Sequence, residues 1–211
     1  MIVEIFATEA GADTLPLGYE EVTVVGERVI RMLSDSSTPQ GVVAVARAPE
    51  ATLTELERSD LSLILAGVRD PGNAGTLVRS AAAAAAGAVA FTEGSVDPLN
   101  PKTVRACAGA LFLVPVIRDV ELTEAVGVAR AAGVQVLGAD VQGEAGPDDH
   151  DLTVPTAFVL GNEAWGFDPG VESMLDGTVS IPMPGRAESL NVGIAGSILL
   201  FEAVRRRASA S

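Results

Sequence analysis

The sequence predicts an α/β protein whose mostly parallel sheet is covered by helices on both faces. Short β-branched apolar runs alternate with helical patterns along most of the 211 residues, which is typical of strand–helix–strand units. Residues 63–66 and 158–160 are continuously apolar, as expected of parallel strands buried on both faces. Hydrophobic residues make up 48% of the chain, which excludes intrinsic disorder and supplies enough apolar material for a core.

The expected strands are rich in β-branched residues, and Gly, Pro or Asp occurs at or near their ends. The strands are expected at residues 22–25, 42–46, 62–67, 88–92, 113–117, 134–140, 156–161 and 178–182. Between them, helices are expected at residues 27–33, 51–58, 73–86, 101–110, 122–132 and 190–207. Asn73 and Ser189 are residue types that favour N-caps, and they are expected to begin the third and the last of these helices.

A domain boundary is expected after a small N-terminal unit. Residues 34–41 are rich in turn formers, and residues 48–59 are charged and lack a strong strand signal. We therefore expect a unit at 1–47, a linker at 48–60 and a second domain at 61–211. The first unit is too short to build much of a core unaided.

The single cysteine and the single histidine exclude several kinds of site. Cys107 alone cannot form a disulfide framework or a multi-cysteine zinc site, and we expect it to be a small core residue. His150 lies in an acidic loop where we expect it to be exposed, which argues against a Ser-His-Asp triad and a metal centre. With neither a run of about 18 apolar residues nor a basic N-terminal leader, the chain is expected to be cytoplasmic, without membrane contact.

The formal charge of −14 is unevenly distributed. Residues 121–180 carry one basic and eleven acidic side chains, whereas residues 61–120 carry five basic and four acidic ones. Overall acidity argues against non-specific binding of nucleic acid. The basic side chains either belong to an ordinary solvated surface or gather to meet an anion; those concerned are Arg69, Arg79, Lys102, Arg105 and Arg186. Arginines 205–207 either complement the negative end of the last helix or form a nucleic-acid tail.

The first cluster of candidate site residues spans residues 70–79, between an expected strand and an expected helix. Asn73 suits the N-cap, Gly75 permits a close backbone approach, and Arg79 lies one helical turn after Gly75. The carboxyl edge of a parallel sheet is where α/β proteins bind ligands. The cluster predicts either a ligand-binding turn or a plain helix cap with a surface arginine.

Two further clusters follow later strands. Residues 160–167 place two glycines, an amide and the carboxylate of Glu163 after a buried strand, where Trp165 either stacks on a base or packs the loop. Residues 181–191 run from a strand through Pro and Gly into the last helix, with Ser189 as the expected cap. The dinucleotide and P-loop glycine motifs are absent, so those routes to nucleotide binding have no support.

In order and spacing, the three clusters resemble the motifs of the SpoU (TrmH-like) RNA ribose 2′-O-methyltransferases. Residues 70–79, with D-P-x-N-x-G-x-x-x-R, resemble motif one, and L-G-N-E at 160–163 with Gly166 resembles motif two. Residues 181–183 through 189–191 resemble motif three. Residues 100–110 resemble the segment between motifs one and two, and residues 199–205 resemble the rRNA-directed branch.

The resemblance implies S-adenosylmethionine held by a C-terminal trefoil knot that also forms a homodimer, with RNA as substrate. Cofactor contacts, largely through the backbone, are implied at Leu160, Gly161, Ile181, Met183 and Leu190. The reaction site is implied to hold Asn73, Arg79, Glu163, Ser189 and Asn191, without a metal. Because a guanidinium is almost never deprotonated, we expect Arg79 to hold the adjacent phosphate and stabilise the developing alkoxide, oriented by Asn73 and Glu163.

The sequence departs from the family pattern at two places. Family members usually carry a complete N-terminal RNA-binding domain resembling ribosomal protein L30e. Residues 38–46 resemble the end of that domain, with only about half of it preceding, so either the chain starts late or RNA recognition is reduced. Trp165 occupies a loop position where a small or charged residue is expected.

Three functions remain open on the sequence alone. The leading one is an RNA 2′-O-methyltransferase, with rRNA ahead of tRNA as substrate. The second is a non-catalytic RNA-binding homologue, and the third is an α/β enzyme that uses a nucleotide cofactor on small molecules. The retained motif residues argue against the second, and the absent dinucleotide fingerprints argue against the third.

Overall fold

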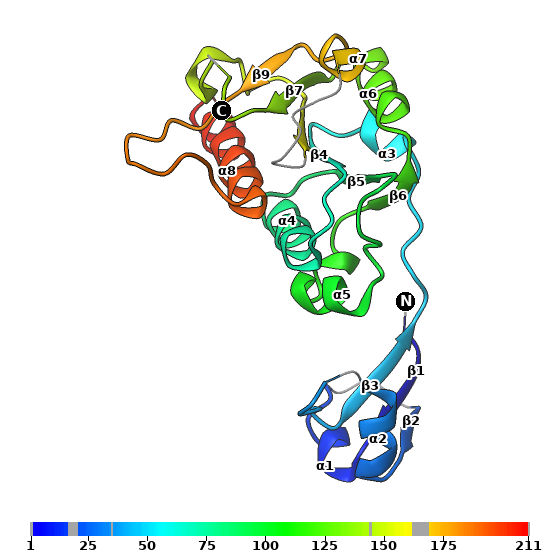
Figure 1. The fold of residues 1–211 in the computed structure, drawn as a ribbon. Coiled ribbons are helices and arrows are strands. Elements are labelled where there is room, and N and C mark those ends of the chain that lie inside the picture. The colour runs from blue at the N-terminus through cyan, green and yellow to red at the C-terminus, as the bar shows by residue number, and fades with distance from the viewer. Residues whose placement is uncertain (1, 17–20, 35, 144, 162–168, 211) are drawn as a thin grey trace. The chain divides into compact units, whose positions relative to one another are not determined.

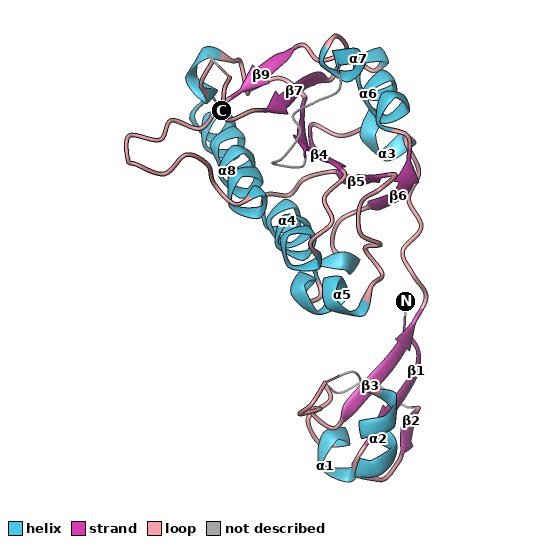
Figure 2. Cartoon of the chain, viewed as in Figure 1, coloured by secondary structure: helices cyan, strands magenta, loops and turns pink. Residues whose placement is uncertain are grey.

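The computed structural model describes residues 2–16, 21–34, 36–143, 145–161 and 169–210. They form two compact units, Met1–Pro49 and Glu50–Ser211 (Figures 1 and 2). No helix in the described part of the chain is long and apolar enough to cross a membrane.

The first unit is a small sheet with two short helices. Its elements are β1 (Ile2–Ala7), α1 (Glu9–Ala12), β2 (Val22–Val24), α2 (Glu27–Leu33) and β3 (Val42–Ala46). The strand order is β2-β1-β3, in which β1 is parallel to β2 and antiparallel to β3. Ile5, Ala7 and Ile30 are its buried apolar side chains. Neither β1 nor α1 was predicted from the sequence, although the β-branched composition of residues 2–6 was a signal for the strand.

The second unit is built on a parallel sheet, which confirms the predicted α/β class. Its strands are β4 (Leu61–Ala66), β5 (Ala88–Thr92), β6 (Val116–Val120), β7 (Gln135–Ala139), β8 (Thr156–Gly161) and β9 (Gly177–Val179). Their order is β6-β5-β4-β8-β7-β9, and each neighbouring pair is parallel. The two central strands, β4 and β8, therefore have hydrogen-bonded neighbours on both sides.

Helices cover both faces of this sheet. They are α3 (Thr54–Glu57), α4 (Pro71–Ala83), α5 (Pro101–Cys107), α6 (Leu122–Ala131), α7 (Pro169–Glu172) and α8 (Val192–Ala210), with short 3₁₀ helices η1 (Ala110–Phe112) and η2 (Pro147–Asp149). Helices α4, α5 and α8 lie on one face, and α3, α6 and α7 lie on the other (Figure 1). Successive residues of β4 alternate between the two cores, with Leu63 and Leu65 in one and Ile64 in the other. This alternation explains why the strand is continuously apolar.

Several predicted boundaries differ from the structure by two or three residues, at both ends of helices. Helix α4 begins at Pro71, because the Asp70 carboxylate caps it by accepting from the Asn73 N–H at 2.7 Å, so Asn73 is not the cap. It ends at Ala83, three residues early, and Ala85 adopts the left-handed conformation with φ 53°. Helix α8 begins at Val192 and not at residue 190, for a reason given with the site.

Two predicted strands are shifted. The strand expected at residues 113–117 is β6 at 116–120, because residues 110–112 form η1. The strand expected at 178–182 ends at Val179 in β9. Residues 50–60, expected to be linker, belong to the second unit, where Leu56 is fully buried against the second core.

The prediction for the burial of the cysteine is confirmed, whereas that for the histidine is wrong. Cys107 is fully buried, as predicted, and burial raises the pKa of its thiol. His150 was expected to be exposed, and this was wrong: it is half-buried, and its Nε2 donates to the Thr178 carbonyl at 2.9 Å. The hydrogen bond to β9 explains the burial.

Candidate functional site at the carboxyl edge of the sheet

The carboxyl ends of the central strands bring the predicted motifs to one edge of the sheet. β4 and β8 are parallel neighbours in which Ala66 pairs with Gly161, so the segments that follow them leave the sheet side by side. From β4 the chain moves outwards through β5 and β6, whereas β7, β8 and β9 occupy the other half of the sheet. The strand order therefore reverses beside β4, and such a switch point is where open α/β sheets bind ligands.

Helix α4 is set close to its neighbour by a glycine. Asp70 and Pro71 start the helix, since proline suits its first turn. A Cβ built on Gly75 would lie 2.3 Å from the Cβ of Ala106 and 2.9 Å from its carbonyl carbon, so α4 and α5 touch here. The close approach expected at Gly75 is thus an approach to α5.

Asn73 and Asn191, from motifs one and three, meet directly. The Asn191 Nδ2 donates to the Asn73 Oδ1 at 2.8 Å. The Asn191 Oδ1 accepts from the Gly193 N–H at 2.9 Å and the Ile194 N–H at 3.3 Å, which makes Asn191 the N-cap of α8. Ser189, the expected cap, is an exposed loop residue two positions earlier.

The Asn73–Asn191 contact fixes how the Asn73 amide is presented. Its Oδ1 already accepts a hydrogen bond from Asn191, so its Nδ2 is the group left to donate elsewhere. Asn73 is half-buried and Asn191 is exposed, so the pair lies at the surface of the unit. An oriented amide donor at a sheet edge suits recognition of an oxygen acceptor.

Below this pair, α4 and α8 form a tight seam that was not predicted from the sequence. The hydroxyls of Ser80 and Ser197 lie 2.7 Å apart, and Ser197 also donates to the Gly193 carbonyl at 2.6 Å. A Cβ on Gly196 would lie 2.4 Å from both Leu160 Cδ1 and Leu77 Cδ2. The small residues at 193, 196 and 197 were the signal for this contact, because such spacing lets helices approach closely.

The remaining catalytic candidates have different positions. Arg79 is exposed on α4, and it makes no hydrogen bond or ion pair with any residue that the structure describes. Ser189 is exposed in the loop between β9 and α8, which extends away from the sheet (Figure 1). Glu163 and Trp165 lie outside the described residues. The structure thus joins Asn73 to Asn191 and leaves Arg79 and Ser189 exposed, with no described partner.

The five expected cofactor contacts lie at strand ends and in one loop. Leu160 is buried at the end of β8, and Gly161 follows it in the strand. Ile181, Met183 and Leu190 are half-buried, and Ile181 packs against the core. Between residues 181 and 190 the backbone makes no hydrogen bond to any described part of the chain, so its N–H and C=O groups are available to a ligand.

The C-terminal arginines are held within the protein rather than forming a tail. Arg207 donates to the carbonyl oxygens of Asp60, Leu152 and Val154 at 2.7–3.0 Å. Burial lowers the pKa of its guanidinium. Arg205 and Arg206 pair with Glu202, and Arg206 also pairs with Asp148.

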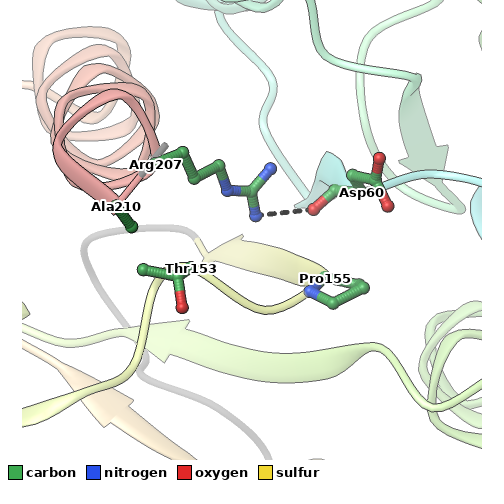
Figure 3. A pocket seen from close by; sticks show the side chains of 5 residues that line it. All are labelled: Asp60, Thr153, Pro155, Arg207 and Ala210. Atoms are coloured by element: carbon green, nitrogen blue, oxygen red, sulfur yellow. Dashed lines mark hydrogen bonds between the residues drawn. The ribbon is translucent and has the colours of Figure 1, made fainter.

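Arg207 also lines a pocket of about 340 Å³ with Asp60, Thr153, Pro155 and Ala210 (Figure 3). Asp60 precedes β4 and Pro155 precedes β8, so the pocket lies at the amino edge of the sheet, opposite the motif residues. Figure 3 shows the Arg207 guanidinium pointing at the Asp60 carbonyl. We assign this arrangement to anchoring the end of α8 on the sheet.

A parallel sheet with polar motif residues at its switch point is a ligand-binding site of the α/β class. The SpoU rRNA methylase family model matches residues 60–201, and the chain belongs to this family. It is therefore an S-adenosylmethionine-dependent RNA methyltransferase.

Individual relatives cover most of the chain. The 23S rRNA (guanosine(2553)-2′-O)-methyltransferase RlmP of Bacillus subtilis is 34% identical over 178 residues, or 84% of this chain and 70% of the relative. The 23S rRNA (uridine(2479)-2′-O)-methyltransferase of Streptomyces viridochromogenes is 34% identical over 90% of this chain and 69% of its own length. The crystal structure of the SpoU methyltransferase AviRb from Streptomyces viridochromogenes in complex with AdoMet has a TM-score of 0.83 at 30% identity and covers 99% of this chain and 84% of its own.

Proposed function

We propose that the protein transfers a methyl group from S-adenosylmethionine to a ribose 2′-hydroxyl of large-subunit rRNA. The observation that carries this proposal is the hydrogen bond between Asn73 and Asn191, which joins two sequence motifs 118 positions apart at the carboxyl edge of the sheet. Two relatives that act on 23S rRNA support rRNA as the substrate. An rRNA substrate would place the protein in the cytoplasm.

In this proposal Arg79 is the main catalytic group of the chain. A 2′-hydroxyl is a poor nucleophile and loses its proton as it attacks the methyl group. A guanidinium stays protonated, so Arg79 binds the adjacent phosphate and stabilises the negative charge that develops on the 2′-oxygen. Its exposure and its lack of a described partner support this role, because no carboxylate among the described residues competes for the cation. Asn73 and Glu163 orient it through side-chain oxygens, since a guanidinium only donates hydrogen bonds.

The residues of the β9–α8 loop fit S-adenosylmethionine. When bound, this cofactor supplies the methyl group on its positively charged sulfur. Ile181, Met183 and Leu190 offer half-buried apolar contacts, and the open backbone groups of residues 181–190 offer hydrogen bonds. Leu160 and Gly161 end the neighbouring strand and complete the set of five. We propose that these segments fold as the trefoil knot, with Ser189 and Asn191 between cofactor and substrate.

The test is transfer of labelled methyl groups to rRNA and to tRNA, followed by alkaline hydrolysis. A 2′-O-methyl group protects the neighbouring phosphodiester from alkali, whereas a methyl group on a base does not. We expect an alkali-resistant labelled dinucleotide from rRNA. Label in tRNA alone would favour the tRNA alternative, and cofactor binding without transfer to either RNA would favour a non-catalytic homologue.

We further propose that the chain acts as a homodimer through α8. Ile194, Ile198 and Phe201 recur at i, i+4 and i+7 on this helix, and their side chains are 39–51% exposed. This spacing places the three side chains on one face of the helix, and an exposed apolar face of this kind is typical of a contact with another protein surface. It flanks the seam with α4, so a second copy would lie beside the reaction site.

Ile198→Asp is expected to convert the dimer to a monomer, because a carboxylate cannot be buried unpaired in an apolar contact. Sedimentation velocity at micromolar concentration measures this. Val141→Asp is the matched control, since Val141 is 51% exposed outside α8 and should leave the dimer intact. A wild-type chain that sediments as a monomer would contradict the proposal.

We also propose that the first unit is a partial L30e-like substrate-binding unit. AviRb matches 99% of this chain, which includes that unit, and this supports the proposal. The unit is acidic, so it would contribute shape rather than phosphate contacts.

A further inference from the structure

Residues 98–118, like residues 71–92, form a long segment of this acidic protein without an acidic residue. Residues 98–118 contain Lys102, Arg105 and Arg118 and no Asp or Glu, in a chain with 28 acidic side chains. The segment comprises α5, η1 and the beginning of β6. Asp97 and Asp119 mark its two ends. A gap of this kind creates a local surface that repels anions less than the rest of the molecule does.

The same segment exposes large side chains as well as cations. Phe112 is 54% exposed and Leu113 is 78% exposed, and Lys102 and Arg105 are exposed one helical turn apart on α5. Cys107 and the other inward-facing residues, Thr103 and Leu111, are buried and hold the segment on the core. Surfaces that bind single-stranded nucleic acid combine exposed aromatic rings with cations, and this segment carries both.

The fold at the end of α5 determines that Phe112 faces solvent. Ala108 and Gly109 both adopt the left-handed conformation, with φ of 49° and 86°, and they end the helix and turn the chain into η1. Leu111 then enters the core while its neighbour Phe112 points outwards. The exposed ring is therefore built into a well-defined turn.

This surface adjoins α4, the helix that carries Arg79. α5 touches α4 where Ala106 meets Gly75. Lys102 lies one turn before Ala106, and Arg79 lies one turn after Gly75, so both cations flank the same helix crossing. A strand of RNA whose phosphate binds Arg79 would continue over α5.

We infer that the α5 platform, defined as Lys102, Phe112 and Leu113, binds a single-stranded part of the RNA substrate next to the modified nucleotide. Phe112 stacks on an unpaired base, and Lys102 contacts a phosphate. This inference rests on the proposed function, since it gives that function its substrate-binding surface. RNA is favoured over a protein partner because the positive charges of Lys102 and of Arg79 on the adjoining helix match its phosphates. In addition, an aromatic ring stacks on a base, whereas an aliphatic side chain does not.

The test uses the full chain with a 20-nucleotide single-stranded RNA and the same RNA in a duplex, and measures binding by fluorescence anisotropy. Phe112→Leu is expected to weaken single-strand binding about 10-fold, whereas Phe112→Tyr keeps a ring and stays within about 2-fold of wild type. Lys102→Gln is expected to reduce the slope of log affinity against log salt by about 0.7, and Lys102→Arg restores it. Affinity for S-adenosylmethionine and the melting temperature should not change, because these side chains are exposed.

The outcomes separate the inference from the proposed function. Equal RNA binding by the Leu and Tyr variants at position 112 overturns the inference, even if the wild type methylates rRNA. A shift from dimer to monomer in Phe112→Leu also overturns it, because the platform would then be a subunit contact. Loss of single-strand binding in Phe112→Leu supports the inference, and absence of methyl transfer by the wild type contradicts only the proposed function.

Discussion

Arg79→Lys is expected to lower kcat for methyl transfer to rRNA by at least about 100-fold, the scale of removing one charge-stabilising donor from a reaction site. Lysine keeps the charge but loses the planar fork that can bind a phosphate and a developing alkoxide together. Arg79 is exposed and has no partner among the described residues, so the fold loses no contact. Single-turnover methyl transfer with saturating cofactor measures the chemical step.

A control and a second variant make this test specific. Arg130→Lys changes an exposed arginine of α6, whose partner is Asp176, and should leave kcat unchanged. Arg79→Gln removes the charge as well, and we expect it to be at least as slow as Arg79→Lys. If Arg79→Lys kept near-wild-type turnover, positive charge alone would suffice and the proposed geometric role would be wrong.

The sequence predicted the sheet well because its strands are buried on both faces. In β4 every residue from Leu61 to Leu65 is buried, so the apolar run itself identifies the strand. Other strands were harder to predict. The edge strand β9 has only three residues and was predicted at the wrong position, and β1 was not predicted, in a unit with few buried residues. Strand prediction from composition succeeds where burial is complete and weakens where one face meets solvent.

The candidate site was predictable as a set of motifs but not as a set of contacts. The spacing of residues 70–79 correctly placed Asn73 and Arg79 on one helix. The N-caps were not predictable, because each helix start offers two polar residues that could cap it. Asp70 precedes a proline and takes the cap of α4, and Asn191 takes the cap of α8 in place of Ser189. Which polar residue caps a helix depends on where the chain leaves the sheet, and that is a tertiary property.

The pairing of Asn73 with Asn191 was not visible in the sequence for the same reason. The two residues are joined only because α4 and α8 lie on the same face of the sheet, and Gly196 allows this by leaving room for Leu77 and Leu160. The small residues of α8 thus have a consequence at the site, because they set the distance between two helices that each carry a motif residue. A glycine at a helix contact is therefore a testable part of the catalytic geometry.

Gly75→Ala is expected to destabilise the second unit by about 2 kcal/mol, although alanine is the better helix former by about 1 kcal/mol. The added methyl would lie 2.3 Å from the Ala106 Cβ and 2.9 Å from its backbone carbonyl carbon, and backbone cannot move aside as a flexible side chain can. Helices α4 and α5 must separate, which also displaces Asn73 and Arg79. Chemical denaturation followed by circular dichroism measures the stability change.

Gly127→Ala is the matched control, and its expected effect has the opposite sign. Gly127 lies inside α6, where an added Cβ would meet nothing within 4 Å, so only the helix preference remains and a gain of about 0.5–1 kcal/mol is expected. The same chemical change thus destabilises one helix and stabilises another, and contact with α5 is the difference. Equal effects at the two positions would show that α4 and α5 are not in close contact, and the proposed placement of Arg79 beside the α5 platform would then be wrong.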